Sequence, residues 1–148
     1  MAAWTYQSSG TVAQNGNGAA LVPGAPASVA TGDLLLLCTG QLTSGAAGPG
    51  SITGWTLLKS FGYSGPAVDL WGRIADGGAN DTPSPDWDGT NGSFAWIERW
   101  TGGGYTDLAT IVAHSATESG TSTSLMVPAF TPATVANCLV YGLSLIHI

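Results

Sequence analysis

Positive charge is almost absent from this sequence. Lys59, Arg73 and Arg99 are its only lysine and arginine residues, and with nine acidic residues they leave a net charge of −6. Nucleic-acid binding depends on neutralising phosphates with clustered Lys and Arg, and attraction to anionic lipids depends on the same kind of charge. The sequence therefore predicts neither a nucleic-acid partner nor a membrane partner.

Charge of either sign is scarce, and so are long apolar runs. Only 8% of residues are charged, whereas 44% are apolar. The longest unbroken apolar run, Leu34–Cys38, is far shorter than the ~20 residues that a membrane-spanning helix needs. The first residues show neither the basic nor the apolar region of a signal peptide. We expect a soluble chain made in the cytoplasm, whose low charge favours burial in a larger assembly.

Cysteine is rare, with Cys38 and Cys138 each inside an apolar run. Strands at these two positions would allow a disulfide between them. Because no secretion signal is present, we expect two buried reduced thiols instead. Neither cysteine has a nearby histidine, and their spacing fits no zinc motif.

Glycine, in contrast, is abundant, and its 22 residues help to cut the apolar residues into short runs. The clearest run is Val68–Ala75, in which Asp69, Trp71 and Arg73 alternate with more apolar residues. This period of two is typical of a half-buried strand. Leu34–Cys38 is continuous and bounded by turns, as in a strand buried on both faces. Further strands are predicted at Trp4–Ala13, Ala19–Val22, Gly54–Leu58, Phe94–Trp100, Leu108–Ala113, Thr123–Val127 and Asn137–Leu143.

Eight or nine such strands and no convincing helix predict an all-β fold. We expect an antiparallel β-sandwich, jelly-roll-like, that forms a single domain over residues 1–142. Residues 143–148 resemble a translated sequencing adapter, as arises when environmental DNA is assembled. One or two closing strands of the natural chain would then be missing; the alternative is a genuine final strand.

No catalytic constellation is evident. His114 lies between small residues and lacks a G-x-S-x-G elbow, so we interpret it as structural or surface-exposed. Glu98 and Asp69 could face each other across neighbouring strands as the carboxylate pair of a glycosidase. Solvated charges on two strands are the simpler interpretation. The sequence thus predicts no enzyme and no catalytic residues.

A group of acidic and amide side chains follows the strand at Val68–Ala75. Calcium prefers such oxygen ligands, but a calcium loop also requires a closing bidentate acid, which is absent here. Asp and Asn also populate turns because they form local hydrogen bonds. We therefore predict no metal and no cofactor. The residues of this group are Asp76, Asp81, Asp86, Asp88 and Asn91.

The six tryptophans are the most distinctive side chains. Trp71 shares a strand face with Asp69 and Arg73, so we expect that face to lie outside the deep core. Trp96 and Trp100 share a face with Glu98, and residues four apart in a strand are about 13 Å apart, a span over which flat rings bind sugars. Coverage by another subunit, a loop or a second sheet is the alternative that we favour.

Several short motifs occur in an order that resembles β-sandwich modules in tail-associated and minor virion proteins of tailed bacteriophages. The resemblance covers about Thr31 to Gly102. It departs at Glu98-Arg99-Trp100, where the family more often has small apolar residues, a Tyr and an Arg. It implies a structural or adhesive role and transfers no catalytic residues. The motifs are Gly32-Asp33-Leu34-Leu35-Leu36, Gly54-Trp55-Thr56-Leu57-Leu58, Leu70-Trp71-Gly72-Arg73-Ile74-Ala75-Asp76, Asp81-Thr82-Pro83-Ser84-Pro85, Asp86-Trp87-Asp88-Gly89 and Ala95 to Gly102.

On this basis the expected function is that of a non-enzymatic phage virion or tail-associated module. It would pack against other virion subunits, in a homo-oligomer or a multi-protein assembly, or contact the host surface. Its location would be the virion. The alternative is a carbohydrate-binding module for a host-surface glycan that uses Trp71, Trp96 and Trp100. A glycan-degrading enzyme fragment is the third and least favoured hypothesis.

Overall fold

The computed structural model describes residues 4–15, 21–41, 49–62, 67–83, 92–102 and 108. Within these ranges the chain is antiparallel β-sheet with one short 3-10 turn, so the all-β prediction is confirmed. The elements are β1 (Thr5–Ser9), β2 (Ala13–Asn15), β3 (Leu34–Gln41), β4 (Thr56–Gly62), β5 (Ala67–Ile74), η1 (Ala79–Asp81) and β6 (Ser93–Thr101).

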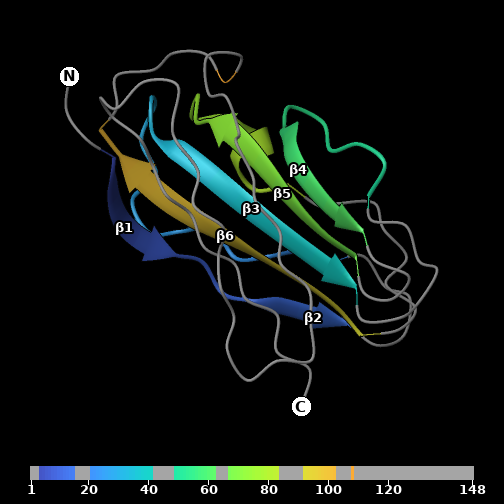
Figure 1. Cartoon of the computed structure of the whole chain (residues 1–148). Coiled ribbons are helices and arrows are strands. Elements are labelled where there is room, and N and C mark those ends of the chain that lie inside the picture. Colours follow the sequence, from blue (N-terminus) through green and yellow to red (C-terminus); the bar gives the residue numbers. More distant parts are fainter. Residues whose placement is uncertain are drawn as a thin grey trace, which may run out of the picture.

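The strands form one sheet in the order β1-β6-β3-β5-β4, and β2 pairs with the other end of β6. Figure 1 shows β3 at the centre, between β6 and β5, with β4 at one edge. All eight residues of β3 are buried, which confirms that its leucine run is covered on both faces. Alternate residues of β3 therefore belong to two different packing layers.

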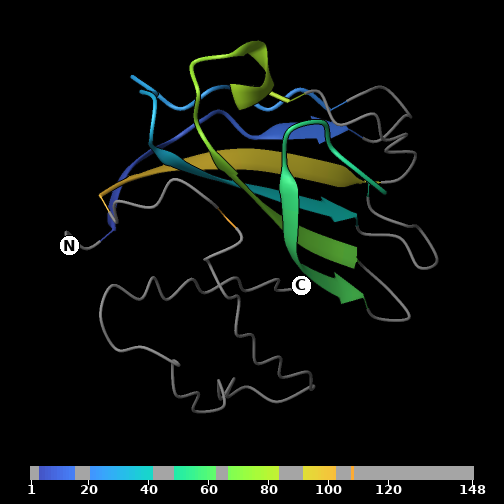
Figure 2. The same ribbon diagram turned by 90° about the horizontal axis from the view of Figure 1, so that it is seen from above.

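One face of the sheet carries the core. Leu35 and Leu37 of β3 and Ile97 of β6 are fully buried there, with Trp71 of β5 beside them. The residues that cover them come from the segments before and after β3 and include Leu21, Ile52 and Trp55. Figure 2 shows the segment before β3 and the η1 turn on the same side of the sheet. We call this side the loop-covered face.

Arg99 ties the segment before β3 to the loop-covered face. Its Nε donates to Asp33 Oδ2 at 2.6 Å, and its Nη1 donates to the carbonyl oxygen of Ala27 at 3.1 Å. The same carboxylate accepts the backbone N–H of Ala30 at 2.8 Å. Charge-assisted hydrogen bonds are stronger than those between neutral groups. Arg99 therefore holds the irregular segment from Ala27 to Asp33 in place.

Arg73 ties two further loops to the loop-covered face, one before β4 and one after β5. Its Nε donates to Asp81 Oδ1 at 2.6 Å, its Nη1 donates to Gly54 O at 2.8 Å, and its Nη2 lies 2.6 Å from Asp76 Oδ1. Arg73 and Arg99 both pair in register with Leu35, one on each side of it. Two arginines thus lie inside the covered layer with carboxylates of their own chain.

The opposite side of the sheet carries Leu34, Leu36 and Cys38 of β3, each at most 3% exposed. We call this side the aromatic face, because large rings of β1 and β6 lie on it. Gly40 leaves room for one of these rings: a Cβ at Gly40 would lie 2.0 Å from Cζ of Phe94.

The prediction of one continuous strand over Trp4–Ala13 is wrong. The first strand, β1, ends at Ser9, and a second strand, β2, begins at Ala13. At the break, Gly10 N donates to Ile97 O at 2.8 Å and Gly24 N donates to Thr11 O at 2.9 Å. A Cβ at Gly10 would lie 1.8 Å from Gly24 O, so the chain diverts where another backbone approaches closely.

The other predicted strands divide into three groups. Those at Leu34–Cys38, Gly54–Leu58, Val68–Ala75 and Phe94–Trp100 correspond to β3, β4, β5 and β6, with shifted ends. Leu21 and Val22 lie outside any strand, although Leu21 is 1% exposed. The predicted strands beyond residue 108 lie outside the described residues, so the sandwich and jelly-roll arrangement stays a prediction. The predicted strands of this last group are Leu108–Ala113, Thr123–Val127 and Asn137–Leu143.

Candidate functional site

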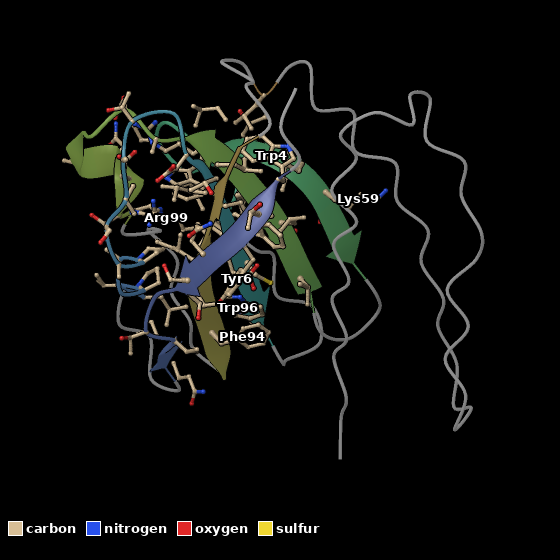
Figure 3. All side chains as sticks on the ribbon, turned by 90° about the vertical axis from the view of Figure 1, so that its left-hand side faces the viewer. Trp4, Tyr6, Lys59, Phe94, Trp96 and Arg99 are labelled. Atoms are coloured by element: carbon tan, nitrogen blue, oxygen red, sulfur yellow. The ribbon has the colours of Figure 1, made fainter. Side chains whose placement is uncertain are left out.

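Four aromatic side chains line the aromatic face along β6 and its neighbour β1. Phe94, Trp96 and Trp100 alternate along β6, and Tyr6 of β1 pairs in register with Trp100. The rings of Phe94 and Trp96 stack with centroids 5.7 Å apart, and Tyr6 meets Trp100 edge-on at 5.4 Å. We call these four residues the aromatic row. Figure 3 shows Phe94 and Trp96 next to each other, with Arg99 on the other side of the sheet.

A single carboxylate interrupts the aromatic row. Glu98 lies between Trp96 and Trp100 on β6, and its two oxygens each accept one indole N–H at 3.3 Å. All three side chains are half-buried. The prediction that they share a face is confirmed. A carboxylate has about four lone-pair positions, so the described residues occupy about half of those on Glu98.

Cys38 of β3 lies on the aromatic face beside Trp96 of β6, with which it pairs in register. It is a buried free thiol. Burial raises the pKa of this thiol far above its ordinary value, and the charges of Glu98 and Asp69 raise it further. The thiol is therefore protonated at neutral pH and is a poor nucleophile. Cys138 lies outside the described residues.

Trp71 does not join the other two tryptophans of the sequence prediction. It points to the loop-covered face, is 3% exposed and belongs to the core cluster. Its indole N–H donates to Thr39 Oγ1 at 3.3 Å. The expectation that its face lies outside the deep core is wrong, because Asp81 and Asp76 neutralise Arg73 and so allow the charged neighbour to be buried.

The carboxylates of Glu98 and Asp69 do not face one cleft. Glu98 pairs with Leu36 and Asp69 pairs with Thr39, so an odd number of positions along β3 separates them. They therefore lie on opposite faces of the sheet. Burial raises the pKa of the Asp69 carboxyl, although a hydrogen bond from Ser60 opposes this. Glycoside hydrolysis by this pair is excluded by the sheet between them.

The described part of the acidic group serves the fold. Asp81 Oδ2 accepts the N–H of Gly77 at 2.9 Å in addition to its ion pair with Arg73. The hydrogen bond from Arg73, and then that from the Gly78 N–H, hold the pKa of Asp76 below its ordinary value. Among the described residues no three His, Cys, Asp or Glu side chains gather as metal ligands would. The remaining residues, Asp86, Asp88, Asn91, His114 and His147, lie outside the described ranges.

A small hollow of about 290 Å³ opens beside η1, between the loop before β4 and the chain after η1. Its lining includes Ser51, Thr53, Asn80 and Thr82, and no charged side chain contributes to it. Without an ionisable group, the hollow offers neither acid–base chemistry nor a charged anchor for a ligand. The aromatic row remains the candidate site.

Two members of the aromatic row were not identified from the sequence. Phe94 lies two residues before Trp96, so the period of two along β6 would have placed it on the same face. Tyr6 reaches the row only because β1 pairs with the end of β6, more than ninety residues later in the chain. No local pattern carries that pairing.

Among the described residues no helix has the length and apolar character to cross a bilayer. Comparison of the chain with protein-family models, with curated proteins and with solved structures finds no match.

Proposed function

We propose that this chain is a non-enzymatic structural module of a tailed-phage virion and that the aromatic row packs against a neighbouring subunit. The order of its sequence motifs, given above, suggests the phage context. The observation that carries the packing role is the row itself, with three large rings of β6 and one of β1 on one sheet face. Tyr and Trp are enriched at protein interfaces and dominate their binding energy.

The charged groups of the described chain support a non-catalytic role. Asp33, Asp76 and Asp81 are each bound to an arginine that anchors a loop. Such ion pairs are part of the fold, and they hold these carboxylates against arginines of the same chain. The thiol of Cys38 is kept protonated in the interior.

Co-expression with the products of the adjacent genes on the source contig tests the proposal. Wild-type chain should co-purify with a tail or capsid protein. The double substitution Trp96→Ala and Trp100→Ala should weaken that complex at least about 30-fold, since even one ring that is a hot spot contributes about 2 kcal/mol or more.

Val22→Ala is the matched control, because Val22 is apolar and 64% exposed but lies outside the row. It should leave the complex unchanged. Adjacent genes for metabolic enzymes, or a complex that tolerates the double substitution, would contradict the proposal.

A carbohydrate-binding role is the second candidate, favoured by the carboxylate between Trp96 and Trp100. Rings that stack on sugars, with a polar acceptor between them, are common in such sites. Trp71 has no part in it, because it is buried on the other face. A glycan array with wild-type chain and Trp96→Ala checks this role, and binding no stronger than background would end it.

A further inference from the structure

We infer that Glu98 binds the side chain of a lysine or arginine supplied by a different protein subunit. The inference deepens the proposed packing function and rests on it. It follows from an inventory of positive charge: the whole chain has three Lys and Arg residues, and all three lie in the described ranges. None of them reaches Glu98.

The two arginines are unavailable because they belong to the other face of the sheet. Both pair in register with Leu35, whereas Glu98 pairs with Leu36. Each is already held by a carboxylate at 2.6 Å. Moving either guanidinium to Glu98 would require it to cross the sheet and leave a buried carboxylate unpaired.

Lys59 lies on the aromatic face but at its far edge. It pairs with Leu70, which pairs with Cys38, which pairs with Trp96, so three strand spacings separate Lys59 from the row. At about 4.8 Å per spacing, the Cα atoms are about 14 Å apart. Figure 3 shows Lys59 projecting away from Trp96. An ion pair between Lys59 and Glu98 of the same chain is therefore excluded.

The surroundings of Glu98 suit a cation. Its two hydrogen-bond partners among the described residues are neutral indole N–H groups, so within the described chain its negative charge is hydrogen-bonded but not neutralised. A sugar hydroxyl would donate a hydrogen bond to Glu98 but would leave the charge, so the cation fits better.

A different protein is favoured over a second copy of this chain. A second copy has only Lys59 to offer, and its approach brings together two chains that each carry a net charge of −6. Like charges of this size oppose association, whereas a basic partner is attracted to the same surface.

Peptide titration followed by NMR tests the inference on the full chain. The probes are blocked glycine-rich pentapeptides with one central residue: lysine, arginine or acetyl-lysine. The signals are the indole N–H groups of Trp96 and Trp100. Lysine and arginine peptides should shift both signals saturably, acetyl-lysine should not, and 0.5 M salt should weaken binding.

Glu98→Gln should weaken peptide binding at least 10-fold, because the amide keeps the shape of the side chain and removes the charge. Asp69→Asn is the matched control, since it removes one charge from the opposite face, and it should bind as wild type does. The lysine and acetyl-lysine comparison needs no variant, so it stands even if Glu98→Gln unfolds.

Four results obtained without the partner subunit would overturn the inference. They are equal shifts with lysine and acetyl-lysine peptides, shifts only with a neutral oligosaccharide, self-association that Lys59→Gln abolishes, and an indole shift near pH 6.5 that His114→Gln removes without peptide. Loss of the subunit complex in the Trp96 and Trp100 double variant but not in Glu98→Gln would refute this inference and leave the packing function intact.

Discussion

The two faces of the sheet bury their side chains by different means. On the loop-covered face, Leu35, Leu37 and Ile97 are fully buried, and the two arginines beside them are paired with carboxylates of the same chain. On the aromatic face, the rings of β6 are half-buried, and the described hydrogen-bond partners of Glu98 are two indoles. Both arginines serve the first face. Among the described residues, both arginines of the loop-covered face have a carboxylate partner, whereas Glu98 on the aromatic face has no cationic partner.

The largest expected effect is the loss of stability when Arg73 is replaced on the loop-covered face. Arg73→Met leaves the carboxylate of Asp81, which is 7% exposed, without its partner. We expect a loss of about 3–5 kcal/mol in the free energy of unfolding, measured by urea denaturation. Lys59→Met removes a charge of the same sign at the sheet edge and should change stability by less than about 0.5 kcal/mol. Equal midpoints for the two variants would mean that Arg73 does not hold the loops.

Two neighbours on β6 compare the faces directly. Ile97→Ala removes a fully buried side chain from the loop-covered face and should cost about 2–5 kcal/mol. Trp96→Ala, on the aromatic face, should cost only about 1–2 kcal/mol, because its ring is half-buried. The same denaturation assay measures both. A larger loss for Trp96 would show that the aromatic face is the more deeply packed layer.

Gly40 tests where the ring of Phe94 lies on the aromatic face. Gly40→Ala places a methyl group where the ring of Phe94 lies, so the ring must move, at a cost of about 1–3 kcal/mol. Gly50→Ala is the control, because a Cβ there meets nothing within 4 Å. A thermal melt of both variants checks this, and a Gly40→Ala melt equal to that of Gly50→Ala would mean that the ring lies elsewhere.

The smallest expected effect is the pH dependence from Asp69 on the loop-covered face. Burial raises its folded-state pKa above 3.8, so the folded state binds the proton more tightly than the unfolded state. Its contribution to stability therefore falls as pH rises through the window above 3.8. Relative to Asp69→Asn, wild type should lose stability between pH 4 and pH 7 in urea titrations.

Asp76→Asn provides the opposite sign. Arg73 holds the pKa of Asp76 below 3.8, so the contribution of Asp76 is present above pH 3.8 and is lost as pH falls below it. Parallel pH profiles of the two variants would contradict the assignment of Asp69 to a buried position.

The central strands could be predicted from the sequence, but the identity of the core face could not. Alternation in Val68–Ala75 gave the correct division of residues between faces. From the sequence, the side that carries Trp71 and Arg73 is too polar for a core. The pattern of one strand does not reveal that Asp81 neutralises Arg73. Charge compensation is a tertiary property, and a period of two cannot report it.

The candidate site was predicted only in part, because some of its residues depend on tertiary pairing and not on a local pattern. Trp96, Glu98 and Trp100 follow from alternation on one strand, whereas Tyr6 depends on a pairing between distant strands. The break near Gly10 was also missed, since it depends on the backbone of Gly24, which lies fourteen positions away in the sequence.

The central place of β3 has a consequence for synthesis. Both strands that pair with it, β5 and β6, come later in the chain, and β6 ends roughly 60 residues after β3. At 5–20 residues per second, the ribosome takes roughly 3–12 s to deliver the last hydrogen-bonding neighbour. For that interval a nascent run of four leucines has at least one unpaired edge. Translation speed and holdase chaperones should therefore govern the yield of native protein more than its equilibrium stability does.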